Sequence, residues 1–488
     1  MRSLIALAAA MLCLPVCAAQ ETPPSSASRA SQPAAGKVFR LHITPAAQPV
    51  PSLKYQLMPP LPDQTPGNAA MLYETVVEGM THNVSPQQFD QIERLLAADL
   101  KEVTRQAVTG LPSAAPDLEI AARRERCDWE LPWRERGVSL VIPYLGRYRQ
   151  ACRILALDIR LSIAEGRYDD ALHDLQTGFA FAHHTQGGTI ESITIADLVS
   201  ISMLSILNNQ VIDLIGSPGS PNLYWALATV PRPFANLWPA MQMERALWQS
   251  SIPALKNVEK AQLTDEQWRD VLRQIQNAFG LPRGPDFLPP DLGLAAFVAA
   301  GYPPAKQYLL AHGYSEQQVE NMPVIQVVLI HQVNQYSQWA DEEFRWFSLP
   351  FPQAYLGLEK WEASFTQAVK QKKVGFLAQF TLPIISHAYL RTTLADRQIA
   401  ALQCIEAIRL YAADHAGQLP RRLQDITEVP VPENPATGKP FGYTVNGNTA
   451  VLEAVSPEPT QEHLERYELI LDSSKPAAAS TDAKGDAQ

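Results

Sequence analysis

The densest group of residues that could do chemistry is a set of histidines in the first half of the chain. His173 and His184 stand eleven positions apart, which is about three turns of a helix. Both imidazoles could therefore share one helix face and bind a metal ion, with His183 beside them. The spacing matches no HExxH or comparable zinc motif, and each ring also fits a partly exposed position on a helix. We predict no metal at these positions.

Two further segments carry residue types that occur in catalytic or binding sites. Gly187-Gly188-Thr189 could cradle a phosphate before a helix, but it lacks the lysine and the preceding strand of a P-loop. Asp414-His415 and Lys439 could exchange protons, yet a histidine is also favourable at a helix C-terminus and a lysine in a turn. The chain contains no GxSxG nucleophile motif. We predict no catalytic residue and no cofactor.

Other polar and aromatic groups have structural explanations. The adjacent carboxylates Asp169-Asp170 and Glu342-Glu343 point to different sides of a helix and form no catalytic dyad. Asn83-Val84-Ser85 fits the glycosylation sequon, but Ser85 also fits the cap of a helix. Six aromatic residues are assigned to the core, with an aromatic groove as the alternative: Trp225, Trp238, Trp248, Trp339, Trp346 and Phe347.

The composition is that of an ordinary globular protein. The chain has 488 residues, of which 46% are hydrophobic and 18% charged, and its net charge is -10. A chain of this length can bury a large core without a disulfide framework. The negative charge and the lack of a basic stripe argue against a nucleic-acid partner, because nothing would neutralise the phosphates.

Three cysteines lie outside the N-terminal leader, and their number is odd. Cys127 and Cys152 could form one disulfide in an oxidising compartment, and Cys404 would then remain free. Buried free thiols explain the same residues, and both alternatives stay open. No CxxC spacing indicates a zinc site.

The N-terminus has the pattern of an export signal. Arg2 gives a positive start, Leu4–Leu14 is apolar and uncharged, and small residues follow at Cys17-Ala18-Ala19. A lipoprotein is disfavoured because the bulky Val16 precedes Cys17. We predict cleavage near Ala19 and an exported protein, periplasmic or extracellular. The apolar stretch 190–215 is interrupted by polar residues, so it is assigned to a buried core helix and the mature chain to no transmembrane segment.

The residues between the termini are mostly helical in pattern. Three segments begin with a cap residue and a Gln three positions later, followed by apolar residues at helical spacing; their caps are Ser85, Thr264 and Ser315. Residues 153–164 and the helix that ends at Ala182 are predicted to form a helical hairpin. Met322-Pro323 should kink or restart a long helix that runs toward Phe347.

The C-terminal part changes character. Residues 396–414 are predicted to form a helix that Gly417 ends and Pro420 prevents from resuming. Residues 441–445 and 450–453 flank Asn446-Gly447-Asn448 and predict a β-hairpin, which a last strand at 467–471 could join.

These elements predict a mainly α fold: an irregular multi-helix domain with a small α+β C-terminal module. The predicted divisions are a signal peptide over 1–19, a disordered linker over 20–52, the helical domain over 53–390, the helix and β-hairpin module over 391–471, and a disordered tail over 472–488. The linker and tail are rich in Ala, Ser and Pro and poor in aromatic residues.

Several short segments resemble a family of uncharacterised secreted bacterial proteins over most of the mature chain. They are Leu53-Lys54-Tyr55-Gln56-Leu57, Pro66-Gly67-Asn68-Ala69-Ala70 with Tyr73, Cys127-Asp128-Trp129, and the stretch Tyr411 to Pro420. The family carries no established activity, so the resemblance implies none.

The C-terminal module also resembles the globular end of type II secretion pseudopilins, in which a helix leads through a turn rich in Pro and Asp to a small sheet. Asn434 stands where those proteins usually carry an aspartate, and the N-terminal pilin helix with its processing motif is absent from the sequence. The resemblance therefore implies the fold of the module and not pilus assembly.

Together these features predict an exported, non-catalytic scaffold or binding protein of the cell envelope, with a protein partner there. The alternative is an envelope hydrolase whose site is assembled from residues distant in sequence. A pocket where several ionisable groups converge would favour the hydrolase. An exposed apolar or aromatic surface would favour the binding protein.

Overall fold

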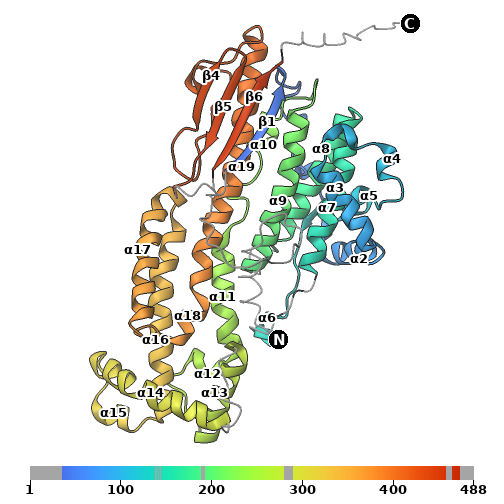
Figure 1. Cartoon of the computed structure of the whole chain (residues 1–488). Coiled ribbons are helices and arrows are strands. Elements are labelled where there is room, and N and C mark those ends of the chain that lie inside the picture. The colour runs from blue at the N-terminus through green and yellow to red at the C-terminus, as the bar shows by residue number, and fades with distance from the viewer. Residues whose placement is uncertain are drawn as a thin grey trace, which may run out of the picture.

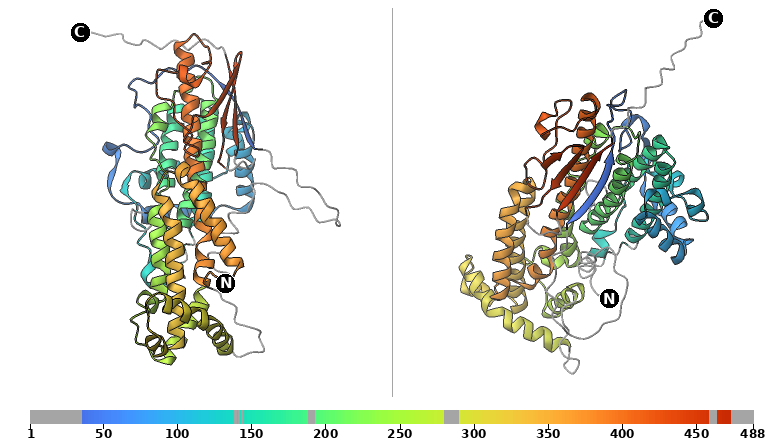
Figure 2. Two further views of the ribbon diagram at one scale, coloured as in Figure 1. Left: turned by 90° about the vertical axis from the view of Figure 1, so that its left-hand side faces the viewer. Right: turned by 45° about the horizontal axis from the view of Figure 1, so that its top comes forward.

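The structure is a computed structural model that describes residues 36–137, 140, 142, 144–187, 193–279, 290–457 and 464–472. The predicted signal peptide and all but one residue of the predicted C-terminal tail lie outside these residues. The fold is mainly α-helical with a small sheet, as predicted. The molecule is elongated, with the sheet at one end and the helices between residues 253 and 320 at the other (Figures 1 and 2).

Buried side chains form two separate hydrophobic cores, and we call the two parts the body and the arm. The body contains α2 Ala70–His82, α3 Pro86–Ala97, α4 Arg105–Val108, α5 Ala115–Ala122, α6 Trp133–Arg136, α7 Leu145–Ala164, α8 Tyr168–His184, α9 Thr194–Ile215 and α10 Tyr224–Ala228. The arm contains α12 Pro253–Lys256, α13 Asp265–Phe279, α14 Pro290–Ala311, α15 Glu316–Glu320, α16 Val324–Phe344, α17 Phe351–Lys370 and α18 Phe376–Thr381. α11 Leu237–Ser251 leads from the body into the arm, and α19 Pro383–Asp414 leads back (Figure 1).

The predicted helix caps are confirmed. At α3 the Ser85 hydroxyl accepts from the Gln88 amide while the Gln88 side chain accepts from the Ser85 amide. Thr264 and Gln267 exchange the same pair of bonds at α13, and Ser315 forms a third capping box at the short helix α15. These reciprocal bonds satisfy backbone N–H groups that a helix start otherwise leaves without partners.

The longer helical predictions also hold. α7 and α8 form the expected helical hairpin through Glu165, Gly166 and Arg167. The predicted break at Met322-Pro323 is a restart: α15 ends at Glu320, and Pro323 is the N-cap of α16.

α9 is the one helix of the described residues that is long and apolar enough to cross a membrane, and half of its most apolar window is buried inside the protein. It packs against α7, α8, α11 and α19. Its polar residues Asp197 and Asn208 are fully buried in that packing.

The sheet has the strand order β1-β6-β5-β4. Its strands are β1 Lys37–Ile43, β4 Gly442–Asn446, β5 Thr449–Ala454 and β6 Glu465–Leu471. The predicted hairpin is confirmed: β4 and β5 are antiparallel, and Gly447 in the turn between them has φ +61°. Glycine adopts that conformation without the strain that a Cβ would cause. A second, two-stranded sheet joins β2 Thr65–Asn68 to β3 Arg124–Arg126.

The prediction of a disordered linker over 20–52 is wrong for its second half. Residues Lys37–Ile43 form β1, which runs parallel to β6 along its whole length. Leu41 and Ile43 are buried, and Arg40 and His42 beside them are exposed, so one face of the strand joins the core of the body. The average composition of the segment concealed this short alternation of apolar residues.

The predicted boundary between residues 390 and 391 falls inside α19, which is continuous from Pro383 to Asp414. The second half of α19 packs against α9, α10 and β5. The helix and hairpin therefore share the core of the body with α7, α8 and α9.

Candidate binding groove

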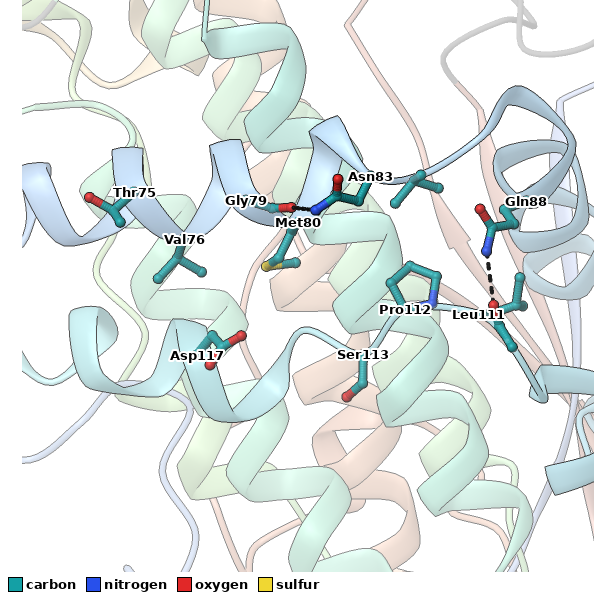
Figure 3. Close-up of a pocket in the computed structure, with 12 residues that line it drawn as sticks. Thr75, Val76, Gly79, Met80, Asn83, Gln88, Leu111, Pro112, Ser113 and Asp117 are labelled. Carbon is teal, nitrogen blue, oxygen red and sulfur yellow. Dashed lines mark hydrogen bonds between the residues drawn. The ribbon is translucent and has the colours of Figure 1, made fainter.

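A groove of about 660 Å³ opens on the surface of the body, beside the start of α3. Figure 3 shows α2 along one side of it and the segment 111–113 with α5 along the other. The residues that line it are Thr75, Val76, Gly79, Met80, Asn83, Val84, Gln88, Gly110, Leu111, Pro112, Ser113 and Asp117.

The two faces of α2 position this groove. Tyr73 and Val77 are buried in the body and fix the helix against α5 and α7. Thr75, Val76 and Gly79 then lie on another face of the same helix, because an α-helix has 3.6 residues per turn. The burial of one face of α2 therefore determines what the other face presents to solvent.

The walls of the groove are fixed by hydrogen bonds within the chain. The Gln88 side chain donates to the Gly110 carbonyl at 2.8 Å and so ties α3 to the opposite wall. The Ser113 hydroxyl donates to Asp158 on α7 at 3.0 Å. The Thr75 hydroxyl donates to the Met71 carbonyl at 2.9 Å, and the Asn83 amide donates to the Gly79 carbonyl at 3.1 Å. The polar groups of the groove are thus largely engaged before any ligand arrives.

The charge of the groove is negative. Asp117 is the only ionisable side chain among the described lining residues, and it is exposed in the first turn of α5. Behind Ser113, Asp158 also accepts from the Ala114 amide at 2.7 Å. Burial and the neighbouring Asp158 raise the pKa of Asp174 to about 6, which reflects the crowding of carboxyl groups there.

A cluster of aromatic rings lies behind the buried face of α2. The Tyr73 hydroxyl is 3.0 Å from Nδ1 of His184, and the Trp129 indole donates to the His184 carbonyl at 3.0 Å. Tyr73 also stacks on Phe181 with ring centroids 4.7 Å apart. This cluster joins α2 to α8 and to the segment that follows β3.

The ionisable groups of this cluster are held in their neutral forms. Burial and the neighbouring His183 lower the pKa of His184 to about 3. Burial, together with Asp128 and Glu74, raises the pKa of the Cys127 thiol, and burial also raises the pKa of Tyr148. A neutral imidazole with so low a pKa is a weak base, and a protonated thiol is a poor nucleophile.

The structure separates the three histidines that the sequence places close together. His173 pairs with Glu119 on α5 at 3.0 Å, whereas His184 bonds to Tyr73 and His183 packs edge-on against Phe234. Across the described part of the chain, no group of three or more His, Cys, Asp or Glu residues could hold a metal ion.

His415 and Lys439, which were considered for proton exchange and assigned to a helix end and a turn, each make other contacts. His415 stacks on Tyr411 with centroids 3.7 Å apart and pairs with Glu428 at 3.4 Å. The Lys439 carbonyl meanwhile accepts from the Asn434 amide in a nearby turn.

The adjacent carboxylates do not act as pairs. Arg167 binds Asp170, while Tyr55 donates to Asp169. Glu342 is exposed, while Glu343 is fully buried. Of Gly187-Gly188-Thr189, considered above as a phosphate loop and not predicted to be one, only Gly187 is described.

The cysteines and aromatic residues have structural positions. The thiols Cys127, Cys152 and Cys404 are all free and buried, so the alternative without a disulfide holds in this structure. Trp225 donates to Gln48 in the body, whereas Trp339 packs against Phe365 in the arm.

The remaining aromatic residues assigned to the core differ in exposure. Trp238 is exposed, and Phe347 packs against Tyr389. A Cβ at Gly357 would meet the ring of Trp346, so that indole lies directly on α17. The side chain of Trp248 lies outside the described residues.

The sequence did not identify the residues of the groove as a site. Asn83 and Ser85 were noted only as a sequon and a cap. The available signal was Gly79, because a glycine inside a helical pattern is unfavourable unless it has a packing or functional reason.

No protein-family model, no curated protein and no solved structure matches this chain. The resemblances to secreted bacterial proteins and to pseudopilins therefore stay predictions.

Proposed function

We propose that this chain is an exported, non-catalytic binding protein of the cell envelope, and that a protein partner binds in the groove between α2, α3 and α5. The observation that carries the proposal is the groove itself. It is open, its apolar lining includes Val76, Met80 and Leu111, and its walls are held by internal hydrogen bonds. Open apolar grooves with fixed walls are typical of sites that receive a segment of another protein.

The N-terminal pattern supports the location. A charged start, a short apolar run and small residues before Gln20 are the features that direct a chain out of the cytoplasm. An exported chain of this kind reaches its partner in the envelope or outside the cell.

The chemistry of the body favours binding over hydrolysis. His184 and Cys127, which a hydrolase could use as base and nucleophile, lie with the aromatic cluster behind the buried face of α2; Cys127 is buried and His184 is half-buried. Their pKa values are displaced away from the range in which a base or a thiolate works near neutral pH. Among the described residues that line the groove, Asp117 is the one ionisable group.

Site-specific photo-crosslinking tests the proposal. A photoreactive residue is placed at Thr75 in the groove and, as a control, at the exposed Glu362 on α17 of the arm. We expect crosslinks to a discrete protein from Thr75 in intact envelopes, and none to that protein from Glu362. Equal crosslinking from both positions would contradict the proposal. Hydrolysis of a model ester or peptide that disappears in His184→Ala would favour the hydrolase instead.

A further inference from the structure

The inference rests on the proposed function and concerns the partner. We propose that the groove receives a cationic amphipathic helix of another protein, which lies directly on the backbone at Gly79 and places a Lys or Arg beside Asp117. Three features of the groove lead to this occupant: the glycine on its α2 side, the engagement of its polar groups, and its charge.

Gly79 has no function in the packing of the chain itself. It lies within α2, where glycine is disfavoured relative to alanine because it gives the unfolded chain more freedom. A Cβ added at Gly79 would meet no atom of the described part of the chain within 4 Å. The effect of glycine here is open space on the α2 side of the groove, which lets the backbone of a second helix approach closely, as small residues do at helix contacts.

The hydrogen bonding of the groove selects a helix over an extended strand. An extended segment would bring unpaired N–H and C=O groups into the groove and would need partners for them. Thr75, Gln88 and Ser113 are already bonded within the chain. A helix satisfies its own backbone groups and needs only apolar contacts, which Val76 and Met80 supply one turn apart on α2.

The charge of the groove selects a basic face on that helix. Asp117 lines the groove and is exposed, and no hydrogen bond or ion pair joins its carboxylate to another described side chain. A Lys or Arg on the flank of the incoming helix would pair with it at the rim. Such a contact favours basic partners and makes the association rate sensitive to salt.

The probe is a fluorescent helical peptide of about five turns, with leucines at i, i+3, i+4 and i+7 and lysines on its other face. Binding to the full mature chain is measured by fluorescence anisotropy. A second peptide carries glutamate in place of each lysine, and a third carries prolines that prevent the helix. We expect the lysine peptide to bind, and the other two to bind at least about tenfold more weakly.

Two helix glycines give a matched pair of variants. Gly79→Leu fills the open space on the α2 side of the groove, whereas Gly146→Leu adds the same side chain on α7, at another exposed helix position with no described atom within 4 Å. We expect Gly79→Leu to raise the Kd of the lysine peptide at least about tenfold and Gly146→Leu to leave it unchanged. Asp117→Asn should raise the Kd less and reduce its dependence on salt.

The proposal is overturned if the lysine peptide does not bind, if the glutamate or proline peptide binds as well, or if both leucine variants bind alike. Any of these results would leave the crosslinks from Thr75 intact and would remove only the helical, basic character of the partner. Loss of the crosslinks would remove the groove as a binding site altogether.

Discussion

The body and the arm are both built mostly from helices, yet different side chains tie those helices together. In the body, Glu406 and Arg409 of α19 form a fully buried ion pair, and Arg409 also donates to carbonyls of Thr44 and Ser220. In the arm, ion pairs such as Lys306 with Glu316 and Glu320 have exposed carboxylates, and several of the more buried ties come from neutral groups. Gln326 donates to the Val258 carbonyl, and other arm ties come from Gln332 and Trp361.

The body and the arm use different ties because the segments that they join differ in their separation along the chain. In the body, segments far apart in sequence meet at α19, including the end of β1 and the turn after α9, and charged side chains can bind several main-chain groups at once. The arm joins helices that follow one another between α11 and α19, so packing of apolar faces does most of the work. We therefore expect the body to depend on charge and pH and the arm on side-chain volume.

The largest effect is expected from Arg409→Ala in the body. Removing the guanidinium leaves the buried Glu406 without its counter-ion and frees the carbonyls of Thr44 and Ser220. Breaking a buried pair in this way should cost about 3–5 kcal/mol. Urea unfolding gives the free energy, and hydrogen exchange followed by mass spectrometry should show lost protection in the body but not in α13 or α16.

The matched control is Arg345→Ala in the arm, which breaks an exposed pair with Glu342. It should leave the unfolding curve unchanged, because water screens exposed pairs. Equal shifts for the two variants would mean that burial of the Arg409 pair does not matter. Lost protection in the arm as well would mean that the two cores unfold together.

Trp268→Ala should destabilise the arm and leave the body protected, the reverse of the pattern expected for Arg409→Ala. Trp268 is fully buried where α13 meets α16. Truncation leaves a cavity that the neighbouring helices fill only in part, at a cost of about 3–4 kcal/mol. Hydrogen exchange should rise in α13 and α16 while α7 and α8 keep their protection. A rise that reaches α7 would argue against two separate cores.

The boundary between body and arm should respond to pH through Asp396. Its carboxylate accepts from the Phe234 amide at 2.9 Å, near the start of α11, and burial raises its pKa from 3.8 to about 6. Between these values the folded protein holds more protons than the unfolded chain. Stability contributed by this group is therefore lost as the pH rises from about 4 to 6.

Asp396→Asn removes this titration and keeps an oxygen that can accept from the Phe234 amide. The variant should be more stable than the wild type at pH 7 by roughly 2–3 kcal/mol, and the advantage should vanish near pH 4. Unfolding curves at several pH values provide the measurement. An advantage of the same size at both pH values would mean that ionisation of Asp396 is not its cause.

The sequence predicts local structure better than the assembly of the two cores. The Ser85 box and the Gly447 turn could be predicted because their hydrogen bonds and φ values depend on a few neighbouring residues. The pairing of Lys37–Ile43 with Glu465–Leu471 could not, because the partner strand lies more than four hundred residues away. Its alternation of Phe39, Leu41 and Ile43 was too short to stand out.

The candidate site was missed for a similar reason. Helical periodicity predicts that α2 has a buried face, but not which helices cover it or which side chains remain open to solvent. The groove arises only when α3 and α5 are placed beside α2. Gly79 becomes informative once the structure shows that no described atom lies within 4 Å of a Cβ placed there.

The smallest predicted effect is a gain in stability on substitution of Gly79. Gly79→Ala should stabilise the body by about 0.5–1 kcal/mol, because alanine restricts the unfolded chain and its methyl group meets no atom of α3 or α5. Urea unfolding should show a higher midpoint at an unchanged slope, with protection raised in α2 and unchanged in the arm. A loss of stability would mean that the open space on the α2 side of the groove is already occupied by the chain. A gain in stability would mean that the natural chain keeps a glycine that makes α2 less stable. This is expected if position 79 must stay small so that a partner can approach closely.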